Sequence, residues 1–199
     1  NGSIDPSPDD APFWALPEQT RAPIAVHIGS FQPAGAGGKR IDMQSLAFLG
    51  RAGASKAGSS TLPVVSTLLF ADVFERHPGV KCVLVEANIG WIPTLLEQID
   101  DMFLRYRFFT KAVEQMKVMR SVLFHRNFWA TFMIDTVGME LRHRLNVDHV
   151  MYSTDYPHTG CDWPNTRTVI ERVFRGIPKD QVKKMLCDNS RALYGLDPL

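Results

Sequence analysis

Four short apolar stretches run through the chain, and each is followed by polar residues. They cover about residues 23–28, 80–87, 127–135 and 149–155. Continuous apolar runs rich in Val, Ile and aromatic residues are typical of strands buried on both faces. Between them, and after the last, lie segments whose apolar residues recur at helical spacing. The clearest of these helical segments cover 60–79, 88–109, 164–176 and 179–195.

The regular alternation of strand and helix predicts a parallel sheet covered by helices. Four such units do not close a barrel, because an eight-stranded barrel usually needs about 250 residues. The 199 residues are therefore interpreted as a single α/β domain that forms the C-terminal half of a (β/α)8 TIM barrel, with the N-terminal half apparently absent. A small open α/β sheet is the competing interpretation. Residues 31–60 are rich in Gly and Ala, as in a lid, a binding loop or a flexible linker.

Composition excludes several classes of partner. The chain carries 22 basic and 21 acidic residues, a net charge of +1, so neither nucleic acid nor an anionic membrane is expected to bind it. No apolar run reaches the roughly 20 residues that span a bilayer, and no leader peptide is visible. The three cysteines are widely spaced and are interpreted as reduced thiols, which predicts a cytoplasmic protein. The start at Asn1 suggests a missing N-terminal part or a split chain.

Each predicted strand ends in a titratable side chain: His27, Glu86, Asp135 and Asp155. Function in parallel α/β folds collects at the carboxyl ends of strands. Asp135 also suits the N-cap of the next helix, and His27 could be a hydrogen-bonded core histidine. Taken together, His27 and Asp155 could ligate one divalent ion, because imidazole and carboxylate both suit zinc or manganese. The chain offers no HxH or HExxH pair to complete the site.

Several segments resemble one known family. They are "PIAVHIGS", "FERHPGVKCVLVEANIGWIPTLLEQID", "MYSTDYPHTGCDWPNTRTVIERVF" and "KKMLCDNSRALYGL". Together they resemble the fifth strand, the sixth unit and the closing segment of the amidohydrolase superfamily. The most similar group includes aminocarboxymuconate-semialdehyde decarboxylase and the resorcylate-type decarboxylases. The resemblance runs over about residues 20–196, and the pairing of TDYPH with NxxRALYG is its most specific part.

The resemblance implies a (β/α)8 barrel that binds one divalent metal ion, with zinc expected first and manganese as the alternative. His27 matches the family's fifth-strand ligand. Asp155 matches the eighth-strand aspartate, which ligates metal or transfers a proton. His158 lies in the family's DYPH stretch, and is expected to line the pocket or orient its neighbours.

The chain differs from the family at two places. The strand-one ligands, HxH or DxH, have no counterpart here. The strand-six histidine of many members is replaced by Ala87, with Glu86 beside it; Glu86 is expected either to carry the proton instead or to support the strand. Trp91, Asn88 and Phe31 are candidate substrate-binding residues, with ordinary packing as the alternative.

These features predict a metal-dependent hydrolase or non-oxidative decarboxylase that acts on a small cyclic or aromatic carboxylic acid. The alternative is a non-catalytic half-barrel that packs against a partner chain. A half-barrel exposes two sheet edges and an apolar inner face. We therefore expect an oligomer or a second chain that completes the barrel, rather than a stable monomer.

Overall fold

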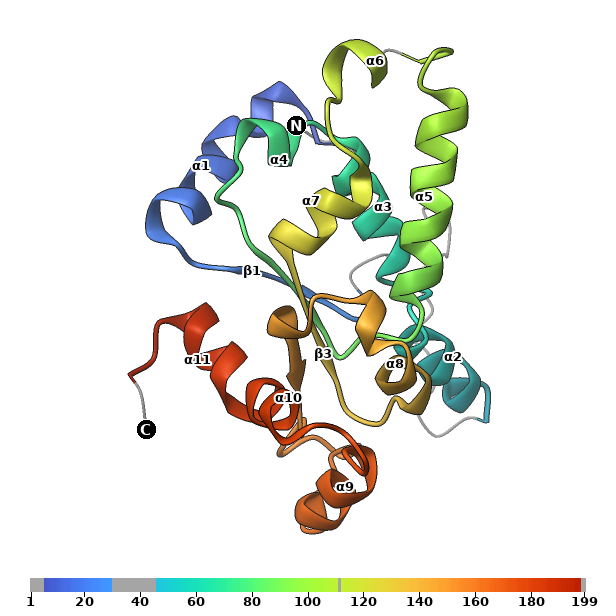
Figure 1. The fold of residues 1–199 in the computed structure, drawn as a ribbon, viewed down its shortest axis with the longest axis vertical. Coiled ribbons are helices and arrows are strands. Elements are labelled where there is room, and N and C mark those ends of the chain that lie inside the picture. Colours follow the sequence, from blue (N-terminus) through green and yellow to red (C-terminus); the bar gives the residue numbers. More distant parts are fainter. Residues whose placement is uncertain (1–5, 30–45, 111, 198–199) are drawn as a thin grey trace.

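The four strands form one parallel sheet in the order β1-β2-β3-β4 (Figure 1). The computed structural model describes residues 6–29, 46–110 and 112–197. The strands are β1 Ile24–His27, β2 Cys82–Val85, β3 Phe128–Phe132 and β4 Val150–Tyr152. Each lies within one of the predicted apolar stretches and is shorter than it. Consecutive strands are neighbours, and their register pairs His27 with Val85 and Phe132 with Tyr152. The prediction of a parallel α/β sheet is thereby confirmed.

Helices occupy every connection, as a parallel sheet requires. Before β1 lie η1 Pro8–Asp10 and α1 Ala11–Thr20. Between β1 and β2 lie α2 Leu46–Lys56, α3 Leu62–Phe70 and α4 Val73–Arg76. Between β2 and β3 lie α5 Ile92–Tyr106, α6 Ala112–Gln115 and α7 Arg120–Asn127. Between β3 and β4 lie α8 Thr136–Glu140, η2 Arg142–Arg144 and η3 Val147–His149. After β4 come α9 Thr166–Val173, α10 Lys179–Lys183, the π-helical turn η4 Lys184–Asp188 and α11 Asn189–Tyr194.

The single helix predicted over 60–79 is wrong in one respect. The chain leaves the helix at Ala71, whose backbone is extended, and resumes a helical turn at Val73. After the break, both Val73 and Phe74 are fully buried. The break starts a new helical turn with its own direction, and this turn places both residues in the core.

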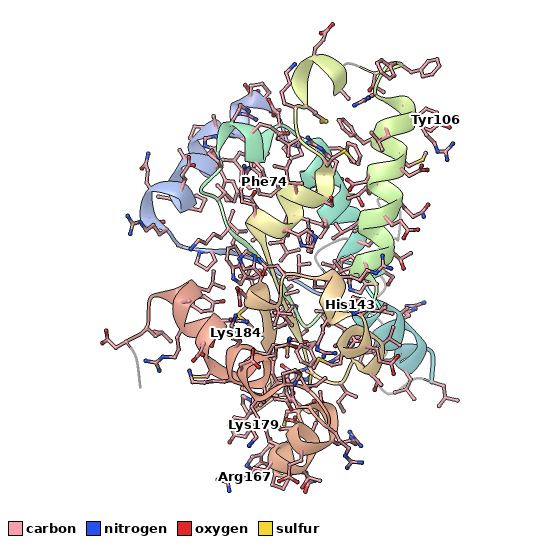
Figure 2. The ribbon with its side chains drawn as sticks, in the orientation of Figure 1. Phe74, Tyr106, His143, Arg167, Lys179 and Lys184 are labelled. Carbon is pink, nitrogen blue, oxygen red and sulfur yellow. The ribbon has the colours of Figure 1, made fainter. Side chains whose placement is uncertain are left out.

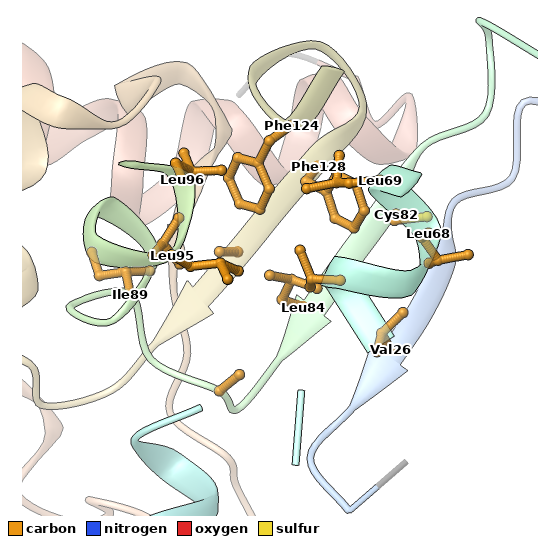
Figure 3. Close-up of a cluster of buried hydrophobic side chains, with 14 of the residues drawn as sticks. Val26, Leu68, Leu69, Cys82, Leu84, Ile89, Leu95, Leu96, Phe124 and Phe128 are labelled. Carbon is orange, nitrogen blue, oxygen red and sulfur yellow. The ribbon is translucent and has the colours of Figure 1, made fainter. Parts of the chain in front are cut away.

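The two faces of the sheet differ in what covers them. One face packs against the helices through Val26, Leu84, Ala130 and Val150, and Figure 3 shows side chains of this layer. The other face carries Val83, Trp129 and Met151 in contact with Leu193 of α11. Alternation of side chains along each strand explains why one sheet supplies both clusters. Figure 2 shows Phe74 among the upper helices and Arg167 and Lys179 at the opposite end.

Arg120 joins three helices from within the core. Its side chain is 0% exposed. Its Nη1 donates to the Leu69 carbonyl at 3.0 Å and to Glu75 Oε1 at 2.7 Å. The guanidinium therefore connects α7 to α3 and α4, and a buried charge of this kind depends on its partners.

Replacing Arg120 with Met should lower the free energy of unfolding by about 3–5 kcal/mol, because Glu75 loses its buried counter-charge. Chemical denaturation of both proteins measures the difference. The matched control is Arg105→Met, which removes an exposed pair with Asp101 and should change stability by less than about 0.5 kcal/mol. Equal effects of the two substitutions would contradict the assigned role of Arg120.

Candidate active site at the carboxyl ends of the strands

His27 and Glu86 meet where β1 and β2 end. His27 Nε2 lies 2.7 Å from Glu86 Oε1, and His27 Nδ1 lies 2.9 Å from the Ile28 carbonyl oxygen. A carbonyl only accepts hydrogen bonds, so this geometry assigns the proton of the neutral ring to Nδ1. The hydrogen bond to Ile28, followed by that to Glu86, raises the pKa of His27 above its usual 6.5, although partial burial opposes the shift. The pair therefore favours an imidazolium held against a carboxylate.

Asp155 lies beyond the end of β4 and faces His158. The carboxylate side chain is only 13% exposed, whereas the His158 side chain is 62% exposed. Asp155 Oδ2 lies 3.2 Å from His158 Nδ1, within ion-pair distance, and among the described residues this buried oxygen has no hydrogen-bond donor. The negative charge of Asp155 also contributes to the raised pKa of His27. Asp155 and the His27–Glu86 pair thus belong to one electrostatic site.

The backbone is unusual at three positions of this region. Glu86, Asn88 and Asp155 adopt left-handed φ values of 61°, 53° and 58°. Non-glycine residues rarely adopt this conformation, and such residues cluster at functional sites. The strand ends therefore carry local strain at two of the residues with candidate chemistry.

The carboxylate of Asp135 holds the loop that follows β2. Its Oδ2 accepts hydrogen bonds from the amides of Ile89 and Gly90, both at 2.7 Å, and its Oδ1 accepts one from Gly138 at 2.8 Å. The predicted cap of α8 is thus confirmed, and the same side chain also fixes a second loop. Glycine is required on both sides: a Cβ at Gly90 would lie 2.9 Å from Asp135 Oδ1, and one at Gly138 would lie 2.4 Å from Ile89.

Thr131 was not among the predicted site residues, yet it holds Glu86 in place. Its hydroxyl accepts a hydrogen bond from the Glu86 amide at 2.9 Å. A polar residue inside the apolar strand "FWATF" was the only available signal. Nearby, the Asn88 side chain accepts from the Met133 amide at 3.4 Å, and the Trp91 indole donates to the Ala87 carbonyl at 2.7 Å.

The predicted substrate-binding residues fall into two groups. Asn88 and Trp91 lie beside Glu86 with the structural contacts just described, and their binding roles stay predictions. Phe31 lies outside the described residues.

A cavity of about 500 Å³ lies elsewhere, next to Met139 and Val173, and no predicted site residue lines it. The strand ends remain the better candidate, because the titratable groups converge there.

The described residues fit part of a divalent-metal site. Imidazole and carboxylate are suitable donors, and the Asp155 oxygen that lacks a hydrogen bond suits a cation. Within residues 6–29, 46–110 and 112–197, however, no three His, Cys, Asp or Glu side chains form a group that could hold a metal. Ligands of one tetrahedral zinc lie roughly 3.3 Å apart, so the 2.7 Å between His27 and Glu86 is a hydrogen-bond spacing. His27 and Asp155 are therefore candidates for a partial ligand set.

Comparison with known proteins identifies the family and the fold. A family model described as amidohydrolase matches residues 1–196. A dihydroxybenzoic acid decarboxylase from Polaromonas sp. JS666, solved with manganese and the inhibitor 2-nitroresorcinol, has a TM-score of 0.68 at 18% identity; the match covers 97% of this chain and 55% of that one. The 5-carboxyvanillate decarboxylase of Sphingomonas paucimobilis has a TM-score of 0.67 at 21% identity, with 96% and 54% covered. The chain thus spans about half the length of these structures.

A third similar structure, 2,6-dihydroxybenzoate decarboxylase from Rhizobium, has a TM-score of 0.67 at 19% identity, with 96% of this chain and 57% of that chain covered. A search of curated proteins found no match. Across the described ranges, no helix combines the length and apolar character that a membrane span requires.

Replacing Glu86 with Gln should lower the pKa of His27, because a neutral amide favours the imidazolium less than a carboxylate does. The fall should be partial, since the Ile28 carbonyl still accepts from the ring. NMR titration of the metal-free protein measures it, with His143→Gln as a control at an exposed site. An unchanged His27 pKa would contradict an interaction between the Glu86 carboxylate and the His27 ring.

The same pair predicts a pH dependence of stability. The folded-state pKa of His27 is raised, so its stabilising contribution is fully present below about pH 6.5 and is lost as pH rises through the folded-state value. Unfolding measured at about pH 6 and pH 8 should therefore show a smaller difference for Glu86→Gln than for the wild type.

Replacing Asp135 with Ala should destabilise the fold by roughly 1–3 kcal/mol, because three amides lose their acceptor. Asp135→Asn should cost less, since its amide oxygen can still accept. Hydrogen exchange should accelerate at Ile89, Gly90 and Gly138 in the Ala variant. Unchanged exchange at these amides would show that Asp135 does not hold the loop.

Proposed function

This chain belongs to the amidohydrolase family, and from that membership we propose that it is the C-terminal half of a metal-dependent enzyme that hydrolyses or non-oxidatively decarboxylates a small cyclic or aromatic carboxylic acid. The observation that carries the proposal is the convergence of an imidazole and two carboxylates at strand ends. His27 and Glu86 are 2.7 Å apart, and the charge of Asp155 acts on His27. Carboxylate and imidazole are the groups that both reactions use to bind metal and move protons.

His27 and Asp155 are the residues that would hold the metal. We expect zinc, with manganese as the alternative that one similar decarboxylase supports. A divalent ion bound there would supply Lewis acidity, either to activate water or to hold a substrate oxygen. The remaining ligands would come from outside the described residues.

The chain's own side chains suggest a division of roles. Asp155 Oδ2 is buried and lacks a hydrogen-bond donor, so it can receive a proton during the reaction. His158 lies beside this oxygen at 3.2 Å and would orient the carboxylate. Glu86 would hold the His27 ring from one side while the Ile28 carbonyl fixes the other, which sets the direction of each ring nitrogen.

The similar structures, which include a dihydroxybenzoic acid decarboxylase and a 5-carboxyvanillate decarboxylase, support a proposal for the substrate class. We propose an aromatic acid of this kind for the present chain. Trp91 and Asn88 lie in the loop region after Glu86. They would contact the aromatic ring and the polar groups of the substrate. The three cysteines, none in a disulfide, are consistent with the proposed cytoplasmic location.

The two sheet edges suggest how the enzyme is completed. In the described part of the chain, β1 and β4 each have a strand on one side only, and this chain spans about half of its structural relatives. We propose that the other half of the barrel, whether upstream sequence or a second chain, pairs with both edges. The 199-residue chain alone should then be unstable as a monomer.

Elemental analysis tests the metal proposal directly. The assembly reconstituted with zinc or manganese should hold one metal ion per site, and His27→Ala and Asp155→Ala should each weaken metal binding at least about tenfold. His143→Ala, at an exposed position, is the matched control and should retain the metal. A wild-type assembly that holds no stoichiometric metal would favour the alternative, a non-catalytic half-barrel subunit.

A further inference from the structure

We propose that Lys56 binds the carboxylate of the substrate. The inference rests on the proposed function and deepens it, because it assigns a residue to the acid group of that substrate. Lys56 is the last residue of α2, in the connection between β1 and β2. Neither the apolar pattern nor the family resemblance singled it out.

The segment around Lys56 is fixed at the site by contacts to two strand ends. Ser60 Oγ accepts a hydrogen bond from the amide of Gly29, two residues beyond His27, at 2.9 Å, and lies 2.7 Å from Ser55 Oγ. Gly58 packs directly on the indole of Trp91, since a Cβ there would lie 2.6 Å from the ring. Lys56 is therefore held between the end of β1 and the loop that follows β2.

The ammonium group reaches the end of a third strand. Lys56 Nζ lies 3.1 Å from Met133 Sδ, and Met133 follows β3 and donates its amide to Asn88. Lys56 is partly buried, and this sulfur is its only hydrogen-bond acceptor in the described part of the chain. A thioether is a weak acceptor and an ammonium group has three N–H donors, so Lys56 can still donate hydrogen bonds to an anion.

The carboxylates of the site give a cation at the same end of the sheet a role. Glu86 and Asp155 place two carboxylates at the strand ends, and like charges would repel an acidic substrate. A lysine at the same rim offsets this repulsion and attracts the acid. The alternative is that Lys56 only complements the C-terminal dipole of α2. Its ammonium, however, hydrogen-bonds across to Met133, not back to a carbonyl of the helix.

The test compares two ligands that differ in the carboxylate alone: 2,6-dihydroxybenzoate and resorcinol. Their dissociation constants are measured by calorimetry on the manganese-reconstituted assembly, with this chain as wild type, Lys56→Met, Lys56→Arg or the exposed-site control Lys179→Met. Lys56→Met should raise the dissociation constant of 2,6-dihydroxybenzoate by about tenfold or more, because one charged hydrogen bond to the carboxylate is lost. Resorcinol binding should stay within about twofold of wild type in the same variant. Lys56→Arg should largely restore acid binding, and Lys179→Met should match wild type.

The outcomes separate this inference from the proposed function. Equal weakening of both ligands by Lys56→Met would make Lys56 a structural residue and overturn the inference. Acid binding that is lost in His27→Ala but unchanged in Lys56→Met would overturn the role of Lys56 alone. Failure of the wild type to bind either ligand would overturn the role of Lys56 and the proposed dihydroxybenzoate-like substrate, whereas the elemental analysis described above tests the metal-dependent enzyme separately. Circular dichroism of each variant verifies that folding is intact.

Discussion

Parallel pairing of the four strands is the constraint on which the site depends. In a parallel sheet every carboxyl end lies at the same edge, so residues far apart in sequence are brought together there. His27 and Glu86 are separated by 59 positions and yet lie 2.7 Å apart. An antiparallel arrangement of the same strands would send alternate carboxyl ends to opposite edges and divide the site.

Strand pairing alone does not fix the conformation of the candidate residues, because they lie at or beyond the ends of the strands. Hydrogen bonds from backbone amides to side chains fix the loops that carry them. Asp135 binds three amides, two in the loop after β2 and one in the first turn of α8, and Thr131 fixes the amide of Glu86. With these contacts in place, Glu86 and Asn88 keep left-handed backbones that an unsupported loop would relax. A site held by a rigid surrounding layer needs little reorganisation when a ligand binds.

The sequence predicted the parts of this structure that depend on local pattern. Apolar runs located all four strands, and the position of His27 and Asp155 at the ends of two of these runs suggested the candidate site. The break at Ala71 was missed, because apolar residues continue at helical spacing through it, whereas the extended backbone of Ala71 appears only in the structure. The second role of Asp135 and the position of Lys56 were also missed. Both depend on contacts between segments more than 40 residues apart, which no single-sequence pattern contains.

The exposure of the candidate ligands indicates where the rest of the site would lie. The His27 side chain, on edge strand β1, is 56% exposed, whereas those of Glu86 and Asp155 are 14% and 13% exposed. An imidazole ligand in a finished metal site is enclosed and oriented by outer partners. His27 has such partners in Glu86 and Ile28. Strands added at the edges of β1 and β4 would bring their own carboxyl ends to this end of the sheet, as closure of a parallel barrel requires. The same closure would remove both exposed edges and bring missing ligands to His27, so completion of the fold and completion of the site are one event in the proposed enzyme.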